Sequence, residues 1–337
     1  MNLLERAWYR AVPAWPVIAV ALLPFAGLFA LVAGARRRAY RAGWLRRRLL
    51  PVPVVVVGNL TVGGTGKTPL VLWLARALRR RGYTPGILSR GYGGNPRRSV
   101  EVGATATAEA VGDEPLLLAR ASDCPVWIGA DRAAAGAALL AAHPRCDVLI
   151  ADDGLQHYGL ARQTELAVVD GDRGFGNGLP LPAGPLREPV SRLARVDAVV
   201  INAAALTAVD RTLAAGRPAF AMVLVGTHLR NLADPARVGD LASLRGKPVH
   251  AVAGIGNPQR FFDRLAGQGL QVTRHAFPDH HPFRAEELDF GDDAPILMTG
   301  KDAVKCEPFA RPHWWVLEAV VEIEHGLDDL VIARLVS

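Results

Sequence analysis

The feature that most constrains how this chain can fold is an apolar, β-branched run that leads into a glycine-rich turn and then a helical pattern. The run covers residues 54–57, the turn ends in Gly-Lys-Thr at 66–68, and leucines then recur at helical spacing up to residue 78. This order predicts a strand, a phosphate-binding loop and a helix over 69–81. Glycines let consecutive backbone N–H groups converge on phosphate oxygens, and the helix directs its positive end to the same place. The segment therefore predicts a site for a nucleoside triphosphate.

Eight consecutive residues of this loop are candidates for nucleotide binding. They are Thr61, Val62, Gly63, Gly64, Thr65, Gly66, Lys67 and Thr68. In a loop of this kind the lysine reaches the β- and γ-phosphates, and the hydroxyl of Thr68 holds Mg²⁺. Thr61 stands where the usual pattern has its first glycine. An ordinary glycine-rich turn is the alternative, and the strand and helix on either side argue against it.

Beyond residue 51, short apolar strands alternate with helical patterns. The predicted fold is α/β: a P-loop NTPase-type, mostly parallel sheet with helices on both faces, a second smaller α/β lobe, and an amino-terminal hydrophobic membrane helix. The predicted strands cover 54–57, 85–88, 126–128, 148–151, 166–169, 198–201, 272–276 and 295–299, and the helices 69–81, 114–121, 131–142, 203–215 and 258–266. The expected division is a membrane anchor with a basic juxtamembrane segment (1–50), a P-loop core (51–205), a linker (206–245) and the smaller lobe (246–337).

The amino-terminal segment predicts association with a membrane. Residues 11–35 contain no charged side chain, and seven arginines follow between Arg36 and Arg48. A continuous helix over this run would be about 37 Å long, enough to cross a hydrocarbon core of roughly 30 Å. The positive-inside rule places the part that follows in the cytoplasm. Pro24 predicts a kink or a break in the helix, so a single crossing and an in-plane or re-entrant anchor both stay open, with a cleaved signal peptide as a third alternative.

The charge of the chain is concentrated in this same segment. Residues 1–50 hold nine arginines and one glutamate, a net charge of +8, against +7 for all 337 residues. The basic character is therefore local, which argues against a general nucleic-acid-binding surface and favours an anionic membrane face. Cys124, Cys146 and Cys306 are widely spaced, so the sequence predicts reduced thiols and neither a disulfide framework nor a zinc site.

Several polar clusters follow predicted strands or begin predicted helices. The strand over 148–151 ends in Asp152 and Asp153, the arrangement of a Walker B element, where a carboxylate holds the metal near the Thr68 hydroxyl. Asp113 and Glu114 begin a helix, where the simplest interpretation is an amino-terminal cap. The polar segment 89–94 follows a strand and is expected at the same edge of the sheet as the phosphate loop. The pair at 280–281, flanked by prolines, could be structural or bind adventitious metal.

Together these segments resemble the tetraacyldisaccharide 4′-kinase family of lipid A biosynthesis. The matching segments are 59–69, 89–92, 112–115, 152–157, 170–178, 182–188, 254–258, 279–280 and 298–302. Asp-Asp-Gly-x-Gln-His and Pro-Ala-Gly-Pro-Leu-Arg are much more specific than a phosphate loop, and Thr61 matches this family's form of the loop. The glycine- and proline-rich stretch 171–189 also predicts a long ordered loop over a site. The resemblance implies ATP-dependent phosphorylation of the 4′-hydroxyl of a tetraacylated glucosamine disaccharide 1-phosphate.

The resemblance also implies roles for individual residues. Asp113 would be the base that takes the proton of the sugar hydroxyl, with His280 orienting it and Lys67 acting on the phosphates. Thr68, Glu114, Asp152 and Asp153 would share Mg²⁺, with the two aspartates not separable from the sequence. The residues expected against phosphates or lining the nucleotide or acceptor site are Ser89, Tyr92, Arg132, Gln156, His157 and Arg187.

A membrane-associated P-loop NTPase switch acting on a protein partner is the competing hypothesis. Such proteins often carry a lysine where this chain has Thr61-Val62, and a switch needs neither a separate general base nor a lipid anchor before its first strand. The kinase hypothesis instead predicts a lipid substrate, ATP and Mg²⁺, a place on the cytoplasmic face of the inner membrane, and no obligate protein partner or nucleic acid. Dependence of ATP turnover on a lipid acceptor separates the two.

Overall fold

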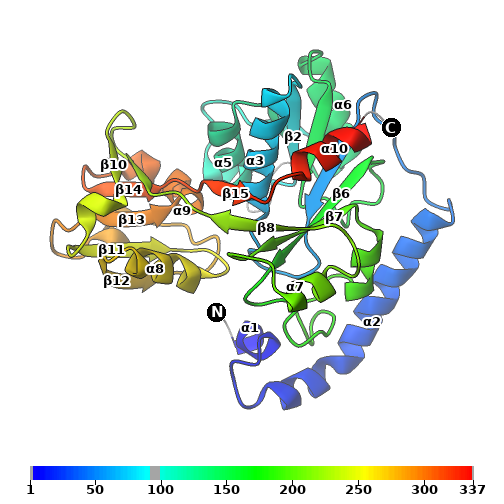
Figure 1. The fold of residues 1–337 in the computed structure, drawn as a ribbon, viewed down its shortest axis with the longest axis horizontal. Coiled ribbons are helices and arrows are strands. Elements are labelled where there is room, and N and C mark those ends of the chain that lie inside the picture. Colours follow the sequence, from blue (N-terminus) through cyan, green and yellow to red (C-terminus); the bar gives the residue numbers. More distant parts are fainter. Residues whose placement is uncertain (1–2, 92–98, 336–337) are drawn as a thin grey trace.

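The computed structural model describes residues 3–91 and 99–335 and shows two α/β lobes with the amino-terminal helices beside the larger one (Figure 1). In the described residues the larger sheet has nine strands. Their spatial order is β15 (Val321–Ile323), β8 (Ala219–Leu224), β7 (Ala198–Asn202), β6 (Thr164–Asp170), β1 (Val54–Gly58), β5 (Val148–Asp152), β2 (Pro85–Ser89), β4 (Val126–Ile128) and β3 (Val100–Glu101). The edge strands β3 and β15 pair antiparallel and the others parallel. This confirms the predicted class of sheet.

The central strand β1 shows why these residues form a sheet covered on both faces. Val55 and Val57 enter one apolar core, and Val54 and Val56 enter another, because successive strand side chains point to opposite faces. All are buried, as in parallel sheets covered by helices. One core includes α3 (Lys67–Arg80), α5 (Asp113–Ser122) and α10 (Leu327–Leu335), and the other includes α6 (Arg132–Ala142) and the short helix η1 (Val190–Arg195). The remaining helices of this lobe are α4 (Ala108–Val111) and α7 (Ala208–Leu213).

The smaller lobe contains a sheet that has six strands in the described part of the chain. Their order is β10 (Val238–Asp240), β9 (His228–Asn231), β14 (Trp314–Leu317), β13 (Ile296–Thr299), β11 (Pro248–Ala253) and β12 (Gln271–Ala276). Helix α8 (Pro258–Gly267) packs Phe261, Phe262 and Leu265 on one face of this sheet. Helix α9 (Gly300–Cys306) contributes Ala303 to the core on the other face. Short helices η2 (Leu241–Leu244), η3 (Ala285–Leu288) and η4 (Glu307–Phe309) complete the lobe.

The two sheets do not follow the division predicted at residues 205 and 245. Strands β9 and β10 lie inside the segment expected as a linker and belong to the smaller sheet, while β8 belongs to the larger one. After the smaller lobe, the chain returns to the larger sheet as β15, which pairs with β8. The smaller lobe is therefore inserted between two strands of the larger one, and the chain passes between the lobes twice (Figure 1).

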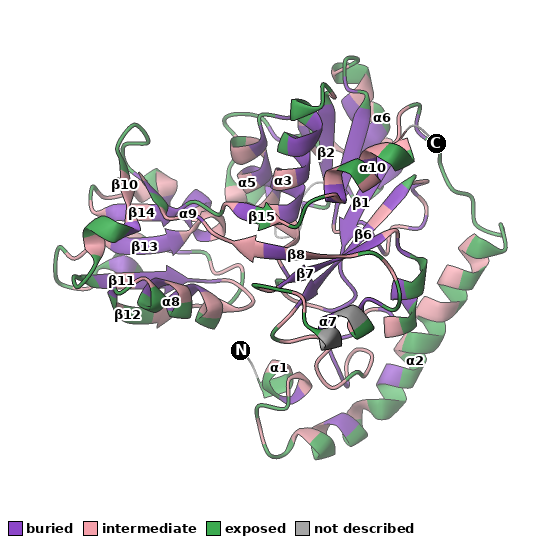
Figure 2. Cartoon of the chain, viewed as in Figure 1, coloured by how far each residue is buried: buried purple, intermediate pink, exposed green. Residues whose placement is uncertain are grey.

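The amino-terminal segment forms α1 (Leu3–Trp8) and α2 (Trp15–Arg41). The expected break at Pro24 is not present, since α2 continues through this residue. A proline removes one helical hydrogen bond and is tolerated inside apolar helices where local adjustments satisfy the freed carbonyl. Of the helices in residues 3–91 and 99–335, α2 alone is long and apolar enough to cross a membrane. Most of its surface is exposed (Figure 2).

Candidate functional site

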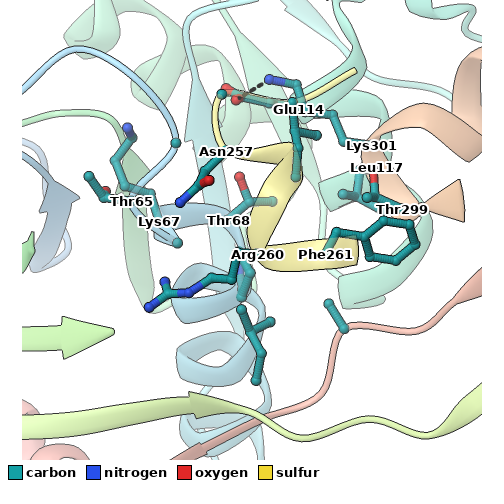
Figure 3. A pocket seen from close by; sticks show the side chains of 18 of the residues that line it. Thr65, Lys67, Thr68, Glu114, Leu117, Asn257, Arg260, Phe261, Thr299 and Lys301 are labelled. Carbon is teal, nitrogen blue, oxygen red and sulfur yellow. Dashed lines mark hydrogen bonds and ion pairs between the residues drawn. The ribbon is translucent and has the colours of Figure 1, made fainter. Parts of the chain in front are cut away.

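A cavity of about 1530 Å³ lies between the two lobes, at the carboxyl edge of the larger sheet. The phosphate loop lines one side with Glu114 and Lys301 close by, and Asn257 and Arg260 of the smaller lobe also line the cavity (Figure 3). Polar groups from both lobes therefore converge on one space, which is where open α/β sheets bind ligands.

The phosphate loop has the backbone shape that its glycines allow. Gly66 precedes α3 and has φ of 100°, in the left-handed region. A Cβ at this position would lie 2.7 Å from Met222 Cε and 2.8 Å from Asn202 Nδ2, so a larger residue does not fit. The side-chain amide of Asn202 also donates a hydrogen bond to the Thr65 carbonyl, at 3.2 Å. The end of β7 thus supports the loop from behind.

Lys67 is held where the loop meets the carboxyl end of β5. Its Nζ donates to Asn59 Oδ1 at 3.2 Å and lies 3.7 Å from Asp153 Oδ1. Gln156 supports this arrangement, because its Nε2 donates to the Asn59 carbonyl at 3.0 Å. The ammonium group is thereby kept at the opening of the loop, close to the amino terminus of α3, where a phosphate would bind.

Asp152 and Asp153 end β5 in different environments. Burial raises the pKa of Asp152, and the neighbouring Glu114 carboxylate adds to this. Burial acts in the same direction on Asp153, but Lys67 and Arg187 hold the pKa of that carboxyl below its usual range. Two adjacent carboxylates with opposite shifts are typical of a functional site.

The Asp152 carboxylate has a free oxygen that fits a cation. Ser89 Oγ donates to Asp152 Oδ2 at 3.2 Å, whereas Oδ1 is buried and has no hydrogen-bond partner among the described residues. A buried carboxylate oxygen without a partner is costly unless a ligand or cation satisfies it. In residues 3–91 and 99–335, no three His, Cys, Asp or Glu side chains are placed to hold a metal by themselves. This agrees with a Mg²⁺ site of the type that uses one or two carboxylates together with substrate phosphates.

Asp113 and His280 form a pair across the two lobes. His280 Nδ1 lies 3.0 Å from Asp113 Oδ2 and 3.1 Å from Oδ1. The hydrogen bond with Asp113 raises the pKa of His280. Burial opposes ionisation of Asp113, but His280 and Lys301 together hold its pKa below the usual range. His280 lines the cavity, whereas the Asp113 side chain is 3% exposed and lies behind it.

Lys301, at the start of α9, links the pair to the rest of the site. Its Nζ lies 3.0 Å from Glu114 Oε1 (Figure 3), 3.1 Å from Asp279 Oδ1 and 3.3 Å from His280 Nε2. These carboxylates keep the pKa of Lys301 above its usual range despite burial. Lys301 lies in the matching segment 298–302, but the sequence pattern did not predict a role for it. The chain has only four lysines, and this scarcity was the one feature of the sequence that could have drawn attention to Lys301 as a site residue.

The other predicted site residues lie in different positions. Arg187 lines the cavity, and its Nη1 lies 2.9 Å from Asp153 Oδ2. Arg132 is buried behind the carboxylates, where Nη1 donates to the Gly129 carbonyl at 2.5 Å and burial lowers its pKa to about 10. Burial also lowers the pKa of His157 to about 4, so this ring is neutral. Neither of these two lines the cavity, and their contact with a substrate stays a prediction. Tyr92 lies outside the described residues.

The amino-terminal segment and the glycine-rich loop 171–189 close another side of the cavity. Glu5, Trp8 and Tyr9 line it together with Arg173 of the loop. Arg173 Nη1 donates to the Gly256 carbonyl of the smaller lobe at 2.8 Å. The sequence predicted a loop over a site here, but it did not predict that the first helix would join the lining.

Several known proteins are similar to this chain over most of its length. The tetraacyldisaccharide 4′-kinase of Azoarcus sp. is 54% identical over 317 residues, which cover 94% of this chain and 92% of that one. The enzyme of the same name from Alkalilimnicola ehrlichii is 55% identical over 342 residues, covering 99% and 97%. A crystal structure of the "apo" form of LpxK from Aquifex aeolicus in complex with ATP is 30% identical, with a TM-score of 0.78, and covers 94% of this chain and 99% of that chain. A sequence profile described as tetraacyldisaccharide-1-P 4′-kinase matches residues 18–336, and this chain belongs to that family.

Proposed function

We propose that this chain transfers the γ-phosphoryl group of ATP to the 4′-hydroxyl of a tetraacylated glucosamine disaccharide 1-phosphate, a step of lipid A biosynthesis. One observation carries the proposal: the phosphate loop of the larger lobe and His280 of the smaller lobe, with Asp113 behind it, lie at the same cavity. The first group suits a phosphoryl donor, and the second suits a hydroxyl acceptor, which needs help to lose its proton. Family membership supports the identity of the acceptor.

ATP would bind with its phosphates on the loop 61–68. The backbone N–H groups and the amino terminus of α3 supply partial positive charge, and Lys67 supplies a full one. Arg187 lines the same region and adds a second cation. The related crystal structure is described as a complex with ATP, which supports ATP as the phosphoryl donor.

Thr68, Asp152, Asp153 and Glu114 would hold Mg²⁺. All four line the cavity, and the buried Asp152 oxygen without a partner fits a cation. When bound, the metal neutralises charge on the phosphates during transfer. These residues would hold it beside the phosphate loop, with Thr68 supplied by the start of α3 and Glu114 by the start of α5.

The Asp113–His280 pair would accept the proton of the acceptor hydroxyl. The family resemblance implied that Asp113 is the base and that His280 orients it. Because His280 is the member that lines the cavity, the geometry favours the reverse: the ring receives the proton, and the buried carboxylate orients it and stabilises its charge. Lys301 holds Asp279 and Glu114 beside the ring, so the acceptor enters a fixed set of polar groups.

A lipid acceptor would account for the apolar and basic character of the amino-terminal segment. Apolar side chains along α2 and the arginines around it would hold the enzyme at the cytoplasmic face of the inner membrane, where the acceptor lies. The catalytic part faces the cytoplasm, which supplies ATP. No protein partner is needed for the reaction.

A transfer assay with γ-labelled ATP, Mg²⁺ and detergent-dispersed acylated disaccharide 1-phosphate tests the proposal. We expect label in a lipid-soluble bis-phosphorylated product, and little ATP turnover without the acceptor. Release of label only as free phosphate, or no turnover, would overturn the kinase assignment. That outcome would favour the nucleotide switch and a search for the protein that stimulates it.

A further inference from the structure

The amino-terminal end of α2 is attached to the larger lobe through α1. The Asn177 N–H donates to the Trp8 carbonyl at 2.8 Å, and the Trp8 indole N–H donates to the Pro182 carbonyl at 2.9 Å. The Arg173 guanidinium lies over the Tyr9 ring, 5.0 Å from its centroid. These contacts fix α1 on the loop 171–189, beside the cavity.

The carboxyl-terminal end of α2 is attached to the same lobe. The rings of Tyr40 and Tyr158 lie 6.0 Å apart. Beyond the helix, the Arg48 N–H donates to the Gly159 carbonyl at 2.8 Å, and the Ala161 N–H donates to the Arg48 carbonyl at 2.9 Å. This second attachment lies at the connection between β5 and β6.

Between its ends, α2 has one covered face and one exposed face. Ala19 and Ala26 are 5% and 1% exposed, and a spacing of seven residues places them on the same side of the helix. Val17, Val20 and Leu31 are 72%, 65% and 71% exposed. Figure 1 shows α2 running alongside the larger lobe, and Figure 2 shows its largely exposed surface. A contiguous apolar surface of this length marks a membrane or protein contact.

These attachments are incompatible with a helix that crosses a bilayer. A helix of 27 residues is about 40 Å long, and the hydrocarbon core is about 30 Å thick. Crossing would place α1 on the side opposite the catalytic lobe, and its contacts with Asn177, Pro182 and Arg173 would all be lost. We infer that α1 and α2 lie along a single leaflet of the membrane, with both ends of α2 on the side of the catalytic lobe.

The charge distribution identifies the occupant of the exposed face as an anionic lipid surface. Arg6 and Arg10 precede α2, and the arginine cluster 36–48 follows its apolar part. With α2 in the plane, both groups meet the headgroups of the same leaflet, where each basic residue is attracted by anionic lipid. A crossing helix would separate the two groups and leave Arg6 and Arg10 on the outer side, away from the leaflet that the arginine cluster 36–48 contacts.

This placement brings the cavity to the membrane surface. Glu5, Trp8 and Tyr9 line the cavity and belong to the segment that lies on the leaflet. A lipid acceptor can therefore present its sugar to the cavity while its acyl chains stay in the bilayer. This last step rests on the proposed function, whereas the in-plane arrangement rests on the attachments and the charge distribution.

Side-specific labelling of single cysteines in the full-length protein tests the arrangement. Arg6→Cys in α1 and the matched Arg47→Cys beyond α2 both replace exposed arginines, and the three native cysteines are buried and give the background. We expect a membrane-impermeant maleimide to label both variants in inverted inner-membrane vesicles and neither in intact cells with a permeable outer membrane. Labelling of Arg6→Cys from the outer side, with Arg47→Cys labelled only from the inner side, would overturn the proposal.

A cross-link decides the result if lipid shields Arg6→Cys from the reagent on both sides. Tyr9 and Arg173 face each other, so the double variant Tyr9→Cys/Arg173→Cys should form an internal cross-link with a short bis-maleimide in membranes as well as in detergent. A cross-link in detergent that is absent in membranes would show that α1 leaves the lobe in the bilayer. Kinase activity in the same membranes reports separately on the proposed function.

Discussion

Replacing Asp113 by Asn removes the charge of the Asp–His pair while keeping the size of the side chain. The carboxylate is 3.0 Å from His280 Nδ1 and 3.9 Å from Lys305 Nζ. Asn cannot stabilise a protonated imidazole as an anion does, so the ring becomes a weaker proton acceptor. Lys305 keeps its ion pair with Asp302 at 2.9 Å, which preserves local packing. The variant therefore tests proton transfer more than folding.

The expected loss follows from what general base catalysis contributes. Such groups accelerate reactions by about 10²–10⁴-fold, which corresponds to about 3–5 kcal/mol of barrier. We expect the kcat of Asp113→Asn to fall within this range. The KM for ATP should stay near its original value, because the Asp113 side chain does not line the cavity that contains the phosphate loop.

The pH dependence of kinase activity tests the proton-transfer role of the pair independently. The pKa of His280 is raised above 6.5, first by its hydrogen bond with Asp113, while burial and Lys301 oppose this. Below the raised pKa the ring already carries a proton and cannot accept one. Activity should therefore be lost as pH falls through a value above 6.5, and it should persist at higher pH. In Asp113→Asn this acidic limb should move to lower pH, since the main cause of the shift is removed.

Initial rates at saturating ATP, measured across pH with the detergent-dispersed acceptor, provide the assay. Asp123→Asn is the matched control, because Asp123 follows the same helix and its side chain is 83% exposed. The control should leave both kcat and the acidic limb unchanged. A near-normal kcat in Asp113→Asn, or an acidic limb that does not move, would refute the proton-transfer role of the pair.

Three further perturbations address other parts of the molecule. Lys67→Ala should lower turnover by orders of magnitude with the fold intact, measured by the transfer assay and circular dichroism; near-normal turnover would contradict its role at the phosphates. Deleting residues 1–40 should weaken cosedimentation with vesicles of anionic lipid, and full partitioning of the truncated protein would place the anchor elsewhere. Trp314→Ala, at a fully buried position of the smaller lobe, should lower the free energy of unfolding by about 3–5 kcal/mol in denaturant titration, and a loss under about 1 kcal/mol would contradict the packing argument.

The sequence predicted the parts of the fold that are set by local patterns. Strand β4 covers the predicted residues, and β1, β2, β5, β6 and β7 differ from prediction only at their ends, because continuous β-branched runs between turns mark buried parallel strands. The helix predicted over 203–215 is reduced to α7 (Ala208–Leu213), since the residues after β7 form turns. Strands β8, β9, β10, β14 and β15 were not predicted. Their side chains mix buried and exposed positions, and the pairs β8–β15 and β9–β14 join strands that are far apart in the chain.

The candidate site also has one part that local sequence patterns predict and another part that they do not. The phosphate loop and the carboxylates after β5 follow from strand–loop–helix patterns, which are local. The contact between Asp113 and His280 joins residues 167 positions apart, and only the resemblance to a family brought them together in the sequence. Nothing in the sequence pattern pointed to Trp8 in the cavity lining, because its partners, Asn177 and Pro182, lie in a loop without regular structure.

The return of the chain to the larger sheet has a consequence for synthesis on the ribosome. Strand β15 and helix α10 are the last described elements, and α10 packs on α3, the helix that follows the phosphate loop. Domains tend to fold as units as they emerge. Here the nucleotide lobe lacks an edge strand and a covering helix until the smaller lobe has emerged, because β15 and α10 follow that lobe in the chain. The anchor emerges first and the support of α3 last, so a nascent chain can reach the membrane before it has a complete ATP site.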